Sequence, residues 1–194
     1  MTAPTPATIT VTPARGVRAL GLDLSLRSTG VASSLGWCTR IRPGGPGSPN
    51  RHMCGLERLR YIVAKVRALA VDYDLAVIEG AAYARGGQAG HDELSALRWM
   101  VRDAVDRAGI PIAMVPPTTL KLWATGSGKA SKADMLTAAV TRYPLADVRT
   151  DDEADALHLA GMGHMWLTGP GTLPDHQQRA MRGVPWPVSE VTVR

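Results

Sequence analysis

Short apolar runs that suit buried strands alternate along this chain with segments of helical periodicity. Three strands are predicted first, in RALGLDL, TGVASS and GWCTRI, joined by tight turns into an antiparallel meander. Apolar residues then recur at helical spacing over 51–70 and 91–108, and the runs DLAVIEG and IPIAMV follow these two helices as further strands. The alternation predicts an α/β fold, with a mixed sheet of five strands and helices on both faces.

Helices are expected to dominate the remainder. Thr118 is a candidate cap for a short helix, which Gly126 ends, and Ser131 starts a helix that reaches Tyr143. Thr150, with a glutamate three residues later, starts a final helix that runs to about Trp166. With the short helix left aside, the expected order of elements is β-β-β-α-β-α-β-α-α.

Composition and length favour one compact domain. With 194 residues, 45% of them hydrophobic, the chain suits a folded body over 17–168, a flexible N-terminal segment over 1–16 and an irregular C-terminal tail over 169–194. No run approaches the length of about 18 apolar residues that a membrane span needs, and the first residues lack a basic start followed by an apolar block. The expectation is a cytoplasmic protein with no membrane partner.

Cysteine and lysine usage narrow the chemistry. Cys38 and Cys54 form neither a disulfide framework nor a CxxC zinc pair, so oxygen or imidazole ligands, and hence hard ions, are favoured for any metal. The net charge of +5 is compatible with a polyanionic partner, although it is common among proteins without one. Three lysines cluster at Lys121, Lys129 and Lys132.

Four carboxylates stand at positions where they can converge. Asp23 and Glu79 end two predicted core strands, while Asp152 and Asp155 share one face of the last helix because they are three residues apart. If the two strands are neighbours and the helix crosses them, four carboxylates meet, and divalent cations would relieve their repulsion. Two such ions about 3.5–4 Å apart can hydrolyse a phosphodiester. The ordinary alternative is that each acid is solvated at a strand end or favoured by the helix dipole.

The lysines have functional and ordinary interpretations too. Lys132 is expected in the first turn of a helix, where the dipole disfavours a cation, and it is a candidate for holding a scissile phosphate or stabilising charge during hydrolysis. Lys121 is a weaker candidate of the same kind, and Lys129 is a candidate phosphate contact.

Four segments resemble the RuvC family of Holliday junction resolvases: GLDLSLRSTGVA, LAVIEG, TLKLWATGSGKASKADML and DDEADALHLA, in this order. The resemblance covers residues 18–165 and implies an RNase H-like fold, a homodimer, and two Mg²⁺ ions per site for which Mn²⁺ can substitute. It implies that Asp23, Glu79, Asp152 and Asp155 are the metal-binding catalytic acids, with DxxDA the tightest match. It also matches Lys132, and less closely Lys121, to basic residues near the cleaved strand.

Two departures from the family pattern stand out. The family commonly has D-P-G after the first strand, whereas this chain has Asp23-Leu24-Ser25. The family also places an aromatic residue, typically Phe, shortly after the second acid; Ala82 takes that place here and the chain has no Phe. Tyr83 is then the candidate for stacking on bases. Hydrolysis is less affected by this departure than selectivity for junctions.

The resemblance predicts a magnesium-dependent endodeoxyribonuclease that resolves four-way DNA by paired nicks. Arg85, Tyr83 and the three clustered lysines are the predicted DNA contacts. His158 is a candidate for the edge of the site or for a structural role, and Arg98 with Arg102 forms either a contact surface or a solvated face. The alternatives left open are an RNase H-like nuclease for flaps, forks or hybrids, and a branched-DNA-binding recombination protein that does not cleave.

Overall fold

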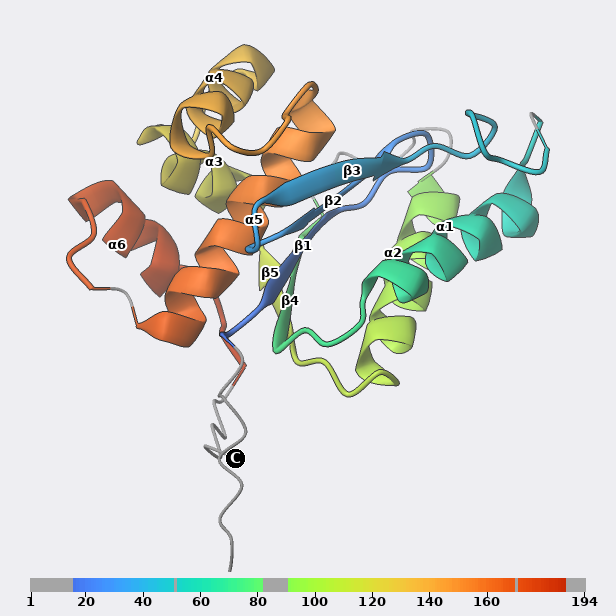
Figure 1. The fold of residues 1–194 in the computed structure, drawn as a ribbon, viewed down its shortest axis with the longest axis horizontal. Helices are drawn as coiled ribbons and strands as arrows, with labels where there is room; N and C mark the ends of the chain where they lie inside the picture. The colour runs from blue at the N-terminus through green and yellow to red at the C-terminus, as the bar shows by residue number, and fades with distance from the viewer. Residues whose placement is uncertain (1–15, 51, 82–90, 170, 188–194) are drawn as a thin grey trace, which may run out of the picture.

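A five-stranded mixed sheet forms the centre of the protein (Figure 1). The computed structural model describes residues 16–50, 52–81, 91–169 and 171–187. The strands are β1 (Ala19–Asp23), β2 (Thr29–Ser33), β3 (Trp37–Ile41), β4 (Leu75–Glu79) and β5 (Ile112–Val115), in the spatial order β3-β2-β1-β4-β5. β1 and β2, and β2 and β3, pair antiparallel, whereas β1 with β4 and β4 with β5 pair parallel. The predicted meander and mixed sheet are confirmed.

Helices cover both faces of the sheet, as predicted (Figure 1). On one face lie α1 (Gly55–Leu69) and α2 (His91–Asp106), whose buried residues share a core with β1 and β4. On the other lie α3 (Pro117–Thr125), α4 (Lys132–Arg142), α5 (Asp151–Thr168) and α6 (Asp175–Arg182). The central strands β1 and β4 are buried on both faces, which explains their nearly continuous apolar sequences.

Helix α5 lies directly on the sheet because small residues line the contact. A Cβ atom on Gly21 would lie 1.9 Å from the carbonyl oxygen of Ala156, and one on Gly163 would lie 2.7 Å from Val77. Neither glycine has room for a side chain: Gly21 lies against the backbone of α5, and Gly163 lies against side chains of β1 and β4. This close packing fixes which residues of α5 face the ends of β1 and β4.

The capping prediction is confirmed for two helices and wrong for one. The Ser131 hydroxyl accepts from the backbone N–H of Asp134, whose carboxylate accepts from that of Ser131, and Thr150 caps α5 through Glu153. Helix α3 instead begins with Pro117 after Pro116, so Thr118 lies inside its first turn. A proline at the first helical position loses no intrahelical hydrogen bond and supplies the helical φ angle, which accounts for the earlier start.

The C-terminal segment contains a helix where an irregular tail is predicted. Helix α6 buries Ala180 and Met181 against α3, and Val184 joins the same core. Its eight residues include only these two apolar ones, so the sequence offers too weak a pattern to reveal it. Four helices thus follow β5, one more than the three described from the sequence. Residues 1–15 of the predicted flexible segment lie outside the described residues, and no helix in the described part is long and apolar enough to cross a membrane.

Candidate active site

The two strand acids lie side by side at one edge of the sheet. β1 and β4 are adjacent and parallel, with Leu22 opposite Ile78, so Asp23 and Glu79 follow at the same end of the two strands. Carboxyl ends of adjacent parallel strands open into the crevice where α/β proteins place their sites. The two side chains form a hydrogen-bonded carboxyl pair.

Helix α5 brings the other two acids to the same place. Asp23 lies opposite Gly30 in the β1–β2 ladder, and a Cβ atom on Gly30 would lie 2.0 Å from the carbonyl oxygen of Asp152. The first turn of α5 therefore rests on β2 beside Asp23. Asp155 follows one turn later on the same face of the helix. The four acids that the sequence singled out are thus brought together from three elements.

Crowding of these acids disfavours their charged forms. Burial, and then the negative charges of Glu79, Asp155 and Asp152, raise the pKa of Asp23 well above its usual value. Burial also raises the pKa of Glu79, which the hydrogen bond from Asp23 and the positive charge of Arg98 partly oppose. For Asp155, burial together with the charge of Glu79 raises the pKa to about 7. The site is an anionic cluster that lacks sufficient positive charge.

The donor set suits a hard divalent cation. The atom Oδ1 of Asp155 is buried without a hydrogen-bond partner among the described residues, and the surrounding donors are carboxylate oxygens, the ligands that Mg²⁺ and Mn²⁺ prefer. In the described part of the chain, however, no three His, Cys, Asp or Glu side chains already stand in a metal-binding arrangement. Asp23 and Glu79 bond to each other, and Asp152 accepts a hydrogen bond from Ser28. Metal binding would therefore reorient carboxylates that are now bonded to protein groups.

Two of the predicted lysines lie close to the acids. The ammonium of Lys132 forms an ion pair with Asp151, the first residue of α5, and this hydrogen bond raises the pKa of Lys132. The positive charges of Lys121 and Lys132 both act on Glu79. Asp151 was not among the predicted site residues, although it begins the same acidic run as Asp152.

Arg98, which the sequence predicts with Arg102 as either a contact surface or a solvated face, is a neighbour of the acids. It extends from α2 on the opposite face of the sheet, is half-buried, and its charge acts on both Glu79 and Asp23. Its Nε atom is buried and has no hydrogen-bond partner in the part of the chain that the structure describes. The sequence feature that indicates a half-buried position for Arg98 is its place directly after the buried Leu97, at the border of the apolar stripe of α2. The following arginine, Arg102, instead lies over the ring of Trp99, with 4.9 Å between the guanidinium carbon and the ring centroid.

Other candidates lie elsewhere. Lys129 is exposed and lines a surface hollow with Thr125 and Asp134. His158 is fully buried, with 3.2 Å between its Nε2 and the carbonyl oxygen of Met135, and burial lowers its pKa to about 4. The possibility that His158 reaches the edge of the site is therefore wrong, because that face of α5 packs on α4. Tyr83 and Arg85 lie outside the described residues.

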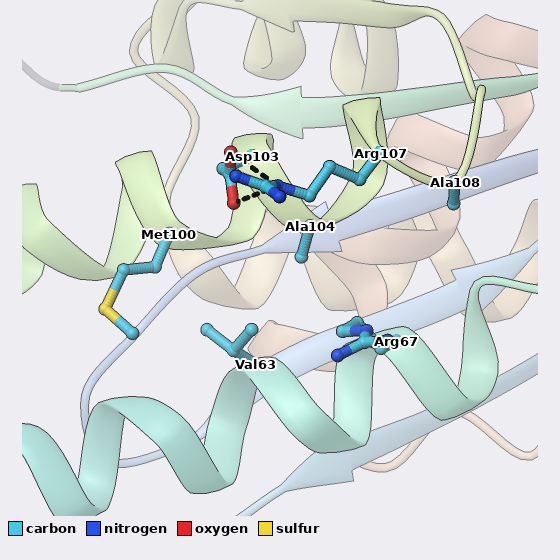
Figure 2. A pocket seen from close by; sticks show the side chains of 7 residues that line it. All are labelled: Val63, Arg67, Met100, Asp103, Ala104, Arg107 and Ala108. Atoms are coloured by element: carbon cyan, nitrogen blue, oxygen red, sulfur yellow. Dashed lines mark hydrogen bonds and ion pairs between the residues drawn. The ribbon is translucent and has the colours of Figure 1, made fainter.

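A cavity of about 500 Å³ lies between α1 and α2, with none of the predicted site residues around it (Figure 2). In it, Arg107, which directly follows the last residue of α2, donates through its Nε atom to both carboxylate oxygens of Asp103, at 2.9 and 3.0 Å. The lining residues are Val63, Arg67, Met100, Asp103, Ala104, Arg107 and Ala108. The cavity adds nothing to the acid cluster.

The sheet order, the helix packed across its central strands and the acids on β1, β4 and α5 place the protein in the RNase H-like class. Two solved structures share the fold: Thermus thermophilus RuvC, with a TM-score of 0.59 and 19% identity over 79% of this chain and 97% of that one, and T. thermophilus RuvC in complex with Holliday junction substrate. The second has a TM-score of 0.55 and 20% identity over 74% of this chain and 90% of that one.

Sequence comparison identifies the family. A crossover junction endodeoxyribonuclease RuvC from Azorhizobium caulinodans is 30% identical over 162 residues, which is 81% of this chain and 94% of that protein. The chain belongs to the RuvC family. A relative of the same name from Salinispora arenicola is 46% identical over 80 residues, 40% of this chain, and the match spans 45% of that relative's length. No protein-family model matches the chain.

Proposed function

We propose that this protein is a magnesium-dependent endonuclease that resolves four-way DNA junctions by paired nicks. The observation that carries the proposal is the meeting of four carboxylates from β1, β4 and α5 at one edge of the sheet. Family membership supports the same chemistry, since the relatives are named crossover junction endodeoxyribonucleases. Homology to a chain solved with Holliday junction substrate supports branched DNA as the substrate.

In the proposed mechanism, Asp23, Glu79, Asp152 and Asp155 would hold two Mg²⁺ ions, or Mn²⁺ in their place. Bound there, the ions would supply activation of water and stabilisation of the leaving oxygen of a phosphodiester. The carboxylates must give up protons to bind the cations, and the pKa of Asp155, which burial raises to about 7, makes this step depend on pH near neutrality.

The basic residues near the acids would bind the DNA backbone. Lys132 is exposed at the start of α4, so its ammonium can exchange Asp151 for a phosphate oxygen and stabilise the charge that develops during cleavage. Lys121 would hold a neighbouring phosphate, and Lys129, on the loop before α4, would extend the contact along the strand. Tyr83 and Arg85 remain proposed DNA contacts on the segment after Glu79.

A homodimer fits the symmetry of the substrate. A four-way junction has near two-fold symmetry, so an isologous pair of subunits would present two sites to two opposed strands. Helix α2 is the proposed contact, because its buried stripe already packs on the sheet while Trp99, 68% exposed, points outward. Size-exclusion chromatography with light scattering of wild type and Trp99→Asp tests this, with a shift from two subunits to one expected.

A second candidate function keeps the nuclease chemistry but changes the substrate to flaps, forks or hybrids. The absence of Phe, which removes the usual stacking residue, favours this candidate. Cleavage rates on a junction, a flap, a hybrid and a linear duplex at equal salt separate the two. Preference for the four-way junction by tenfold or more supports the first function, and preference for another substrate replaces it with the second.

The decisive experiment is the Asp23→Asn variant on a synthetic four-way junction with Mg²⁺. Nicking is expected to fall below detection while junction binding persists, because the change removes a negative ligand but no DNA contact. The matched control is Asp106→Asn, at the end of α2 on the opposite face of the sheet. Full nicking by Asp23→Asn would overturn the metal assignment. Junction binding by the wild type without nicking on any substrate would leave a non-cleaving branched-DNA-binding protein.

A further inference from the structure

A hydroxyl from the turn after β1 is bonded directly to one of the four acids. The Oγ atom of Ser28 donates to Oδ2 of Asp152 at 2.5 Å, across 124 residues of sequence. We propose that Ser28 is a positioning residue: it orients the carboxylate of Asp152 so that the other oxygen, Oδ1, is presented to the metal. The inference rests on the proposed function, because it assumes that Asp152 is a metal ligand.

The turn that carries Ser28 is held by its own hydrogen bonds. Thr29, which is fully buried, donates through Oγ1 to the carbonyl oxygen of Ser25 at 2.7 Å and accepts from its N–H at 3.1 Å. The hydroxyl of Ser25 accepts in turn from the N–H groups of Arg27 and Ser28, at 3.3 and 3.4 Å. These bonds fix the backbone of Ser28. Only the χ1 rotamer of its side chain then has to be set for the hydroxyl to reach Asp152.

The other end of the bond is fixed as well. The carbonyl oxygen of Asp152 lies against Gly30 at backbone distance, so the first turn of α5 cannot shift relative to β2. With both backbones held, the bond from Ser28 determines the rotation of a carboxylate that would otherwise turn freely about its side-chain torsions. One carboxylate oxygen is then committed to the protein and one remains for a cation.

The direction of the effect follows from the chemistry of metal ligands. Carboxylates that bind metals are themselves hydrogen-bonded, and loss of such outer partners costs about 10–100-fold in metal affinity or activity. Asp152 lies in the first turn of α5, and its charge acts on Asp23 across the cluster. An orienting bond therefore reduces the cost of turning Asp152 towards the ions in an already crowded site. Ser28 also belongs to the turn in which this chain departs from D-P-G.

Isothermal titration of Mg²⁺ into the DNA-free protein tests the inference. Ser28→Ala is expected to weaken Mg²⁺ binding about tenfold, and Ser28→Thr, which keeps the hydroxyl, to restore most of it. The matched control is Ser48→Ala, in the loop before α1. The hydroxyl of Ser48 accepts from the N–H of Gly44 at 2.9 Å and donates to the carbonyl oxygen of Asn50 at 3.1 Å, both in the same loop. This control is expected to bind Mg²⁺ as the wild type does.

Nicking of a four-way junction supplies the second readout. For Ser28→Ala the half-saturating Mg²⁺ concentration is expected to rise about tenfold, with a rate at saturating Mg²⁺ within about threefold of wild type. A merely structural role would lower the saturated rate through loss of folded protein and leave the Mg²⁺ dependence in place. If Ser28→Ala melts early, Ser28→Cys repeats the test, since a thiol keeps the volume and is a weak donor.

Unchanged or tighter Mg²⁺ binding by Ser28→Ala, or by Ser28→Cys in its place, overturns the inference; tighter binding would mean that Ser28 holds Asp152 away from the metal. Asp152→Asn separates this failure from failure of the proposed function. If Asp152→Asn abolishes Mg²⁺ binding and nicking while the Ser28 variants behave as wild type, only the role of Ser28 is wrong. If Asp152→Asn also binds and nicks normally, the metal assignment itself fails.

Discussion

The backbone of helix α5 contacts strand β2 at Gly30, where a Cβ atom would lie 2.0 Å from the carbonyl oxygen of Asp152. Gly30 is also the residue that pairs with Asp23 across the β1–β2 ladder. A single small residue therefore couples a strand acid to a helix acid. The geometry of the proposed metal site depends on this contact as much as on the acids.

Gly30→Ala is expected to destabilise the protein by about 1–3 kcal/mol, because the added methyl group meets backbone atoms that must move. Displacement of α5 also moves Asp152 away from Asp23, so Mg²⁺ binding is expected to weaken. Urea unfolding and Mg²⁺ titration measure the two effects. The control is Gly16→Ala, where a Cβ atom meets nothing within 4 Å and stability should change by less than about 0.5 kcal/mol. Equal stability of both variants would contradict the close contact.

The metal-free protein is expected to lose stability as pH rises towards and through 7, because of Asp155. Its pKa is raised to about 7 in the folded state from a usual value of 3.8, so the folded protein retains a proton that the unfolded chain releases. This contribution is complete below about pH 4 and is lost as pH rises through 7. The difference between these two pKa values corresponds to at most about 4 kcal/mol in the free energy of unfolding.

Urea unfolding in EDTA at several pH values, compared between wild type and Asp155→Asn, measures this contribution. The pKa of His158 is lowered to about 4, so its contribution to stability increases as pH rises, opposite to that of Asp155. Because His158 is present in both proteins, its contribution cancels in the difference. Asp155→Asn is expected to be the more stable protein at pH 8, and Mg²⁺ to stabilise only the wild type strongly. A pH-independent difference between the two would show that Asp155 is not perturbed.

Lys132→Met is expected to slow junction nicking about 100-fold while changing stability by less than about 1 kcal/mol. The small stability effect follows from exposure: the side chain of Lys132 is 83% exposed, and its pair with Asp151 is largely solvated. Single-turnover rates at saturating Mg²⁺ and thermal unfolding provide the two measurements. Lys65→Met, on α1 across the sheet, is the matched control. A rate for Lys132→Met like that of the control would remove Lys132 from the proposed machinery.

Trp186→Ala is expected to destabilise the protein by about 2 kcal/mol without abolishing nicking. The ring stacks on Trp166 of α5 with 5.2 Å between ring centroids, and its Nε1 donates to the carbonyl oxygen of Met181 at 2.9 Å. These contacts attach the segment after α6 to the body. Chemical unfolding compared with Leu145→Ala, at a residue that is 97% exposed, checks the prediction. No loss of stability would mean that the C-terminal segment does not contribute to the fold.

Strand and helix periodicity predicted the sheet, the meander and most helices because those patterns are local: a buried strand needs a run such as LAVIE whatever lies beside it. Capping boxes at Ser131 and Thr150 were visible for the same reason. Helix α6 was not, because it has few apolar residues and is stabilised by packing on α3. The N-terminus of α3 was displaced by a proline pair whose effect competes with capping.

The amino-acid sequence by itself determined which carboxylates were available, since their types and their spacing on α5 are written in the chain. Tertiary structure decided that they meet: the register that sets Asp23 opposite Gly30 and the contact of Gly30 with α5 join residues more than 100 positions apart. It also decided that Arg98 and Ser28 belong beside the acids, whereas His158 faces the core. Local patterns specify elements, but only the packing of α5 on the sheet sets which side chains share a site.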